Sequence, residues 1–264
     1  MTNLGHRVVV AVFVGLGLIG CNADSPPMTA PATSRPAAPT SSQPPGAIHP
    51  NCVRPDEQAN VIKFRNTEGV RLVGVLLGDG RTGILLGHEL RSSLCGWMPV
   101  ARQLAERGYR VLAFDFGGFG ESESAADRRT LVEDVVAAAD QLERAGAKRV
   151  VLIGASMGGT AVVSAATEVS APVAAVVSLS GPAVFGGLDA ETAAADLTMP
   201  SYFAAGERDG SFPDSARRMY AAAGSEVKEL KIYDTTRHGI QLVNELPESL
   251  VDLLVFLDHV AAAG

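Results

Sequence analysis

Residues 51–264 alternate between short apolar runs and longer segments whose apolar residues recur at helical spacing. The short runs are typical of strands and lie at 61–65, 71–77, 82–86, 111–116, 150–153, 173–178, 202–205 and 227–233. Helical spacing is found at 97–108, 131–146, 158–168 and 215–223, and again around 250–257. The first two strands, joined at Glu68-Gly69, are expected to be antiparallel. The alternation that follows predicts an α/β fold with a mainly parallel sheet covered on both faces.

The first fifty residues show a different pattern and are not expected to belong to that fold. His6 and Arg7 precede an apolar run at 8–19, which has the length of the hydrophobic core of a signal peptide and is short for a bilayer-spanning helix. Residues 22–50 hold eight of the fifteen prolines and predict an extended tether of at most roughly 90 Å. We therefore expect a signal peptide at 1–20, a tether at 21–50 and the folded domain at 51–264.

The end of the apolar run, Leu18-Ile19-Gly20-Cys21, resembles the lipobox of bacterial lipoproteins. The resemblance implies cleavage before Cys21 and a diacylglyceryl group on its thiol. Together with a further acyl chain, that group would hold the protein on the lipid bilayer of the bacterial cell envelope. The alternative is an ordinary secretory signal with an incidental cysteine.

Residues 15–20 also fit the G-x-G-x-x-G pattern of a dinucleotide site. Such a site opens a helix, whereas Pro26 and Pro27 follow this one, so no nicotinamide or flavin is expected.

Composition and charge exclude further classes of function. The 264 residues are 47% hydrophobic and 19% charged, which is enough apolar material for a large core. The net charge of −7 comes without a long basic block, so a nucleic acid partner is not expected. No cluster of histidines, cysteines or carboxylates has the spacing of a metal site, so neither a metal nor a cofactor is expected. We expect a monomer.

One motif points to nucleophilic chemistry. Gly154-Ala155-Ser156-Met157-Gly158 is a G-x-S-x-G sequence between a predicted buried strand and a predicted helix. This context predicts a strained turn that presents the Ser156 hydroxyl, with Gly154 and Gly158 needed because side chains there would collide with neighbouring backbone. The amide of Met157 would lie at a helix amino terminus, where it can stabilise an oxyanion. The alternative is a glycine-lined turn needed only for packing.

A serine nucleophile needs a base and a group that orients the base. His238 is the best candidate base among the five histidines, because His6 and His49 precede the domain and His259 lies in the last helix. His88 is expected to be structural. For the orienting acid we favour Asp209 in the loop after the preceding strand, with Glu207 as the second choice and Asp234 as the third.

The order Ser156, Asp209, His238 resembles that of the α/β-hydrolase superfamily. The segment 115–122 also resembles a family motif, Asp-x-Arg-Gly-x-Gly-x-Ser, although Gly117 takes the place of the arginine. The resemblance extends from about residue 61 to the C-terminus. It implies an α/β-hydrolase fold with a mainly parallel eight-stranded sheet, helices on both faces and a short or minimal cap at about 182–199.

In that family the second oxyanion donor comes from a His-Gly-x loop after the third strand. Here the loop is His88-Glu89-Leu90, so a residue with a side chain replaces the glycine. The donor could be the amide of Glu89 or that of Leu90, and a misplaced loop would slow the reaction rather than abolish it.

Export would place Cys52 and Cys95 in an oxidising compartment, and we expect a disulfide between them rather than two buried thiols.

These features predict a membrane-anchored serine hydrolase, most simply a carboxylesterase that acts on a small ester or acyl substrate through an acyl-enzyme. Thioesters, peptides or transfer of the acyl group to another alcohol are alternatives with the same machinery. A different class of function is a ligand-binding lipoprotein that has kept the fold and lost catalysis.

Overall fold

The computed structural model describes residues 52–124 and 130–262, all within one compact unit. The signal peptide, the tether and the lipidation at Cys21 expected from the sequence all lie outside the described residues. No helix in the described ranges is both long and apolar enough to cross a membrane.

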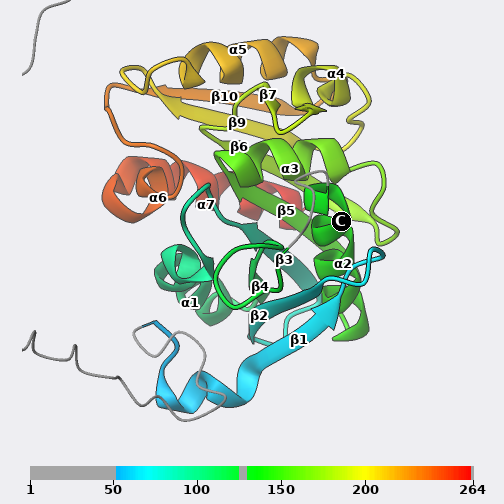
Figure 1. The fold of residues 1–264 in the computed structure, drawn as a ribbon. Coiled ribbons are helices and arrows are strands. Elements are labelled where there is room, and N and C mark those ends of the chain that lie inside the picture. The colour runs from blue at the N-terminus through cyan, green and yellow to red at the C-terminus, as the bar shows by residue number, and fades with distance from the viewer. Residues whose placement is uncertain (1–51, 125–129, 263–264) are drawn as a thin grey trace, which may run out of the picture. The chain divides into compact units, whose positions relative to one another are not determined.

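An eight-stranded sheet forms the centre of the domain (Figure 1), in the order β1-β2-β4-β3-β5-β6-β9-β10. β1 and β2 form an antiparallel hairpin and β2 pairs antiparallel with β4, whereas all remaining neighbours in this sheet are parallel. The predicted number of strands and their mainly parallel arrangement are therefore confirmed. The strands are β1 Val61–Arg65, β2 Arg71–Leu77, β3 Thr82–Gly87, β4 Arg110–Asp115, β5 Arg149–Ala155, β6 Val173–Leu179, β9 Ser201–Gly206 and β10 Lys228–Tyr233.

Helices cover both faces of this sheet and create two hydrophobic cores. One core contains residues of α2, α3, α4 and α5, and the other contains residues of α1, α6 and α7. Short 3-10 helices, η1 Pro55–Asn60 and η2 Leu94–Trp97, precede β1 and α1. The α-helices are α1 Met98–Glu106, α2 Leu131–Arg144, α3 Met157–Ala165, α4 Ala190–Ala194, α5 Phe212–Ala222, α6 Gln241–Glu245 and α7 Pro247–Ala262.

Successive side chains of the central strands pack alternately into the first and the second hydrophobic core. In β5, Leu152 packs into the first core, while Val151 and Ile153 pack into the second, and all three are at most 1% exposed. Strand side chains alternate between the faces of a sheet, so a strand covered on both faces must be apolar throughout. This requirement explains why the central strands could be recognised as continuous apolar runs.

The connection between β6 and β9 is short. It contains a two-stranded hairpin, β7 Val184–Phe185 with β8 Leu188–Asp189, which is followed by the five-residue helix α4. α4 lies in the alanine-rich part of this connection. The hairpin and α6 were not anticipated.

A disulfide joins Cys52 to Cys95, as expected from the sequence. It connects the chain just before η1 to η2, next to the amino end of α1. The neighbouring contact is an ion pair between Arg102 and Glu57, with Nε to Oε1 at 2.7 Å, and both side chains are largely buried. The covalent bond and the ion pair together fix η1 against α1.

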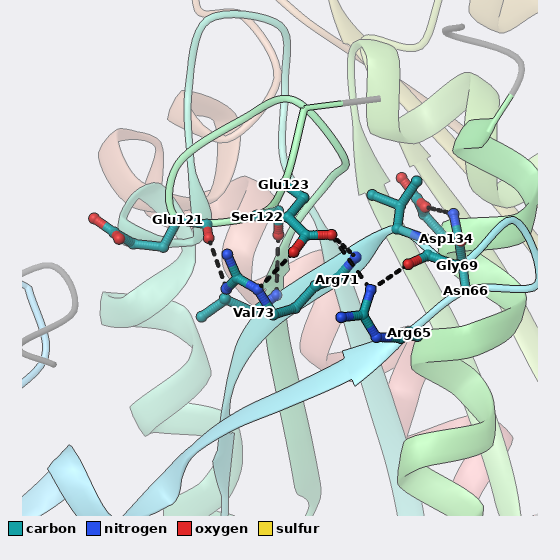
Figure 2. Close-up of polar contacts among 10 residues, drawn as sticks. Arg65, Asn66, Gly69, Arg71, Val73, Glu121, Ser122, Glu123 and Asp134 are labelled. Atoms are coloured by element: carbon teal, nitrogen blue, oxygen red, sulfur yellow. Dashed lines mark hydrogen bonds and ion pairs between the residues drawn. The ribbon is translucent and has the colours of Figure 1, made fainter. Parts of the chain in front are cut away.

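The loop after β4 is tied to the first two strands by polar contacts (Figure 2). Glu123 accepts hydrogen bonds from the backbone amide of Arg71 at 2.9 Å and from its Nε at 3.1 Å. Ser122 Oγ accepts a bond from the amide of Val73 and donates one to the carbonyl of Asp115. Because β2 is in the sheet, these contacts hold the loop over the carboxyl end of β4.

Candidate active site

The turn that carries Ser156 joins β5 to α3 and has a strained backbone. Ser156 has φ 47° and ψ −116°, an unfavourable combination for a residue with a side chain. A Cβ added at Gly154 would lie 2.1 Å from the carbonyl oxygen of Gly158, and one added at Gly158 would lie 2.3 Å from that of Gly87. The prediction that both glycines are needed to avoid backbone collisions is therefore confirmed.

This turn places Ser156 and Met157 at the carboxyl edge of the sheet. Ser156 is only 9% exposed, so the surrounding chain covers most of this residue. Met157 is the first residue of α3, where backbone N–H groups have no acceptor within the helix. The amide beside the serine is therefore free to meet a developing negative charge.

His238 and Asp209 lie together at the same edge of the sheet. Asp209 follows β9, His238 follows β10, and these neighbouring strands are parallel. His238 Nδ1 and Asp209 Oδ2 are 2.8 Å apart, with the carboxylate side chain 10% exposed and the imidazole 28% exposed. A carboxylate can only accept, so Nδ1 donates, and the lone pair of the neutral ring is on Nε2. Within the described residues Nε2 has no hydrogen-bond partner, which leaves it available as a base.

The two alternative acids face arginines instead. Glu207 pairs with Arg217 at 2.5 Å, and Asp234 pairs with Arg208. Of the three acids considered, the structure brings Asp209 to the histidine.

An aromatic ring beside His238 was missed by sequence reasoning. Phe212, the first residue of α5, has its ring centroid 4.3 Å from that of the imidazole, at an interplanar angle of 54°. The contact restricts rotation of the imidazole. Its only trace in the sequence is the position of Phe212, three residues after Asp209.

The loop after β3 is held by His88, which is fully buried. The amide of Phe116 donates to its Nε2 at 3.1 Å, so the ring proton is on Nδ1, which donates to the carbonyl of Glu89 at 2.8 Å. With both nitrogens engaged, His88 has the structural role expected for it. The amides of Glu89 and Leu90 are not donors in any hydrogen bond among the described residues, so both remain candidates for the second oxyanion donor.

The described residues contain no group of three or more histidines, cysteines or carboxylates that could hold a metal ion.

Comparison with known proteins identifies the fold. A family model of the α/β hydrolase fold matches residues 77–197. An esterase of Pyrococcus furiosus superposes with a TM-score of 0.67 at 20% identity, covering 75% of this chain and 90% of that one. An esterase of a Rhodococcus species gives 0.65 at 15% identity, covering 78% and 100%. The chain has the α/β-hydrolase fold.

Curated relatives match less than half of the chain. Epoxide hydrolase A of Mycobacterium tuberculosis is 35% identical over 125 residues, which cover 45% of this chain and 38% of that protein. The uncharacterized protein YfhR of Salmonella typhimurium is 32% identical over 118 residues, covering 41% and 40%. The chain thus spans about two fifths of the length of these relatives. The family model, which ends at residue 197, includes Ser156 but neither Asp209 nor His238.

The α/β-hydrolase motif after β4 has a structural role here. Buried Asp115 accepts bonds from the amides of Leu94 at 2.7 Å and Glu121 at 3.0 Å. Gly120 has φ +49°, and a Cβ there would lie 2.1 Å from Asp115 Oδ2. Gly117, in the position of the motif's arginine, donates its amide to Asp134 at 2.8 Å.

Proposed function

We propose that this protein is a serine hydrolase, and specifically a carboxylesterase. Ser156 Oγ attacks the ester carbonyl while His238 Nε2 accepts its proton, and Asp209 keeps the imidazole in the required tautomer. The amide of Met157, with that of Glu89 or Leu90, binds the oxyanion. His238 then protonates the leaving alcohol, and water releases the acid from Ser156 by the reverse sequence. The observation that carries the proposal is the 2.8 Å contact between His238 and Asp209 at the sheet edge where the strained serine turn lies.

The comparisons support hydrolysis but include two kinds of substrate. The solved neighbours named above are esterases, whereas the relative from Mycobacterium tuberculosis is an epoxide hydrolase. Attack of a serine oxygen on an epoxide would give an ether, which water does not cleave under mild conditions. Attack on an ester gives a new ester on Ser156, which water can cleave. The serine therefore favours acyl chemistry, and thioesters, peptides and acyl transfer remain alternatives of the same kind.

Labelling with a fluorophosphonate tests this function directly. The intact mass of the purified protein is measured before and after the probe, with Ser156→Ala and His238→Ala beside it. We expect one adduct on the wild type and none on Ser156→Ala, with labelling of His238→Ala at least about a hundredfold slower. A folded wild type that stays unlabelled would favour a second function, a binding protein on the same fold.

We also propose that the protein is anchored to the cell envelope through lipidated Cys21. The support is the sequence at 18–21, the apolar run before it and the proline-rich segment after it. Metabolic labelling with a fatty acid, comparing wild type with Cys21→Ser, tests the anchor. A soluble and unlabelled wild type would mean that residues 1–20 act as an ordinary secretory signal.

A further inference from the structure

The side chain of Glu89 contacts the backbone just after His238. Glu89 Oε2 accepts a hydrogen bond from the amide of Ile240 at 3.1 Å. The two residues are 151 positions apart in the sequence, and Glu89 occupies the place where the family motif has glycine. The substituted residue therefore links the oxyanion loop, 88–90, to the segment 238–240, which we call the histidine loop.

The fit between this carboxylate and the histidine loop is close. Gly239 has φ +54°, and a Cβ at that position would lie 2.1 Å from Glu89 Oε2. A side chain there would therefore force the carboxylate away from Ile240. The glycine that follows His238 makes room for Glu89.

The carboxylate is attached to a fixed backbone. The carbonyl of Glu89 accepts bonds from His88 Nδ1 at 2.8 Å and from the amide of Ser92 at 3.1 Å. On the other side, Ile240 is 3% exposed and packs in the hydrophobic core. The bond from Glu89 to Ile240 thus joins two anchored points rather than two mobile ones.

Glu89 is also within electrostatic range of the two candidate catalytic side chains. Burial raises the pKa of Glu89, and the neighbouring groups act in opposite directions, since His238 lowers this pKa and Asp209 raises it. A carboxylate so placed could act through its charge or through its hydrogen bond. The backbone amide needs only an acceptor at the correct distance, and a neutral amide side chain of equal length supplies one.

We propose that Glu89 is a positioning residue that holds the histidine loop against the oxyanion loop through its hydrogen bond to Ile240. This inference rests on the proposed function, because it concerns the geometry between His238 and the oxyanion donors. Displacement of a catalytic group by about 1 Å can cost on the order of a hundredfold in rate. Loss of the acceptor should therefore lower kcat, while KM changes little.

Two substitutions separate the hydrogen bond from the charge. Glu89→Gln removes the charge but keeps an oxygen at the same distance from the backbone. Glu89→Asp keeps the charge but shortens the side chain by one methylene, so that the oxygen no longer reaches Ile240. We expect kcat of Glu89→Gln to stay within about threefold of wild type, and kcat of Glu89→Asp to fall about 10- to 100-fold with KM within about threefold.

Asn244→Ala is the matched control. Its side-chain amide donates to the carbonyl of Gly96 in η2 at 2.9 Å, so this hydrogen bond also ties the chain that follows His238 to the segment between β3 and α1, but on the exposed surface. We expect this variant to keep kcat within about twofold. Thermal unfolding of all variants shows that each is folded at the assay temperature.

The outcomes distinguish this inference from the proposed function. Fluorophosphonate labelling of the wild type at Ser156 establishes the serine hydrolase first, and an unlabelled wild type overturns both. With a labelled wild type, unchanged kcat in Glu89→Asp overturns the inference alone. A Glu89→Gln variant as slow as Glu89→Asp, with the aspartate variant folded, also overturns it, because the charge would then be what matters.

Discussion

Asp209 and His238 meet through a 2.8 Å hydrogen bond because each follows one of two neighbouring parallel strands, β9 and β10. The carboxylate is the more buried partner, with 10% of its side chain exposed against 28% for the imidazole. The surrounding protein therefore encloses the acid, Asp209, while the base, His238, is the more accessible of the two side chains. Glu207 and Asp234, the other acids near the ends of these strands, are engaged by arginines.

Asp209→Asn should leave the fold intact and remove most of the activity. An asparagine can donate as well as accept, so it no longer enforces the tautomer with the proton on Nδ1. We expect kcat to fall by about 10²- to 10⁴-fold in an ester hydrolysis assay. Glu207→Gln is the control and should stay within about twofold, because Glu207 contacts exposed Arg217 instead of His238. Equal losses in the two variants would contradict the assignment of the acid.

Gly154→Ala should destabilise the domain through a backbone collision. The new Cβ would lie 2.1 Å from the carbonyl oxygen of Gly158, and backbone cannot move aside as a flexible side chain can. We expect a loss of about 3 kcal/mol in the free energy of unfolding, measured with urea. Gly69→Ala provides the comparison, since its φ of +79° is unfavourable but nothing lies within 4 Å of the added atom. That variant should lose only about 1 kcal/mol, and a larger loss than in Gly154→Ala would contradict the collision.

Loss of the proton from Asp134 should lower the free energy of unfolding as the pH rises from about 4 to about 6. Burial raises the pKa of Asp134 from its usual 3.8 to about 6, although the carboxylate accepts bonds from the amide of Gly117 and from the side chain of Asn66. Figure 2 shows the contact with Asn66. A group whose pKa is raised on folding binds its proton more tightly in the folded state. The contribution of Asp134 to the free energy of unfolding is therefore fully present below about pH 4 and is lost as the pH passes about 6. The contribution is on the order of 3 kcal/mol at most.

Urea unfolding of wild type and Asp134→Asn between pH 4 and 7.5 checks this expectation. The difference between the two proteins isolates Asp134 from other titrating groups, such as Glu57, whose pKa is lowered mainly by its hydrogen bond to Arg102. The advantage of the wild type over the variant should shrink as the pH rises. An advantage that grows with pH would show that the carboxylate is stabilised in its charged form.

The disulfide should contribute to stability by restricting the unfolded chain. The bridged cysteines are 43 positions apart, and a loop of that length corresponds to about 4 kcal/mol at most. Replacing both cysteines by serine should lower the urea midpoint, and dithiothreitol should lower the midpoint of the wild type but not of the variant. A variant as stable as the wild type would mean that the remaining contacts, such as the buried pair of Arg102 and Glu57, already hold the segment.

Periodicity predicted the framework of the fold because the framework depends on burial. The central strands are apolar on both faces, and the strand Arg71–Leu77 was predicted with the same bounds that the structure has. Helix ends were less accurate. α5 begins at Phe212 rather than near Ser215, because Pro213 is suited to a first helical turn and extends the helix beyond its apolar repeat.

The side-chain contacts of the site were harder to predict than the residues themselves. Ser156, Asp209 and His238 could be named because each follows a recognisable strand. The contact of Phe212 with His238 and that of Glu89 with Ile240 depend on the conformations of loops. No local sequence pattern encodes such loop conformations. The presence of Glu89 in place of glycine could therefore be noticed in the sequence, but its hydrogen bond with Ile240 could not be predicted.

The disulfide between Cys52 and Cys95 also determines how the domain responds to a pulling force. Cys52 precedes β1 in the chain, so a pulling force applied from the amino-terminal side reaches the sulfur–sulfur bond before it reaches β1. Tension would then pass into η2 and α1, whose residues Trp97 and Met98 are fully buried. The antiparallel hairpin of β1 and β2 would be shielded from shear, and the edge of the sheet could not be peeled away while the covalent bond is intact.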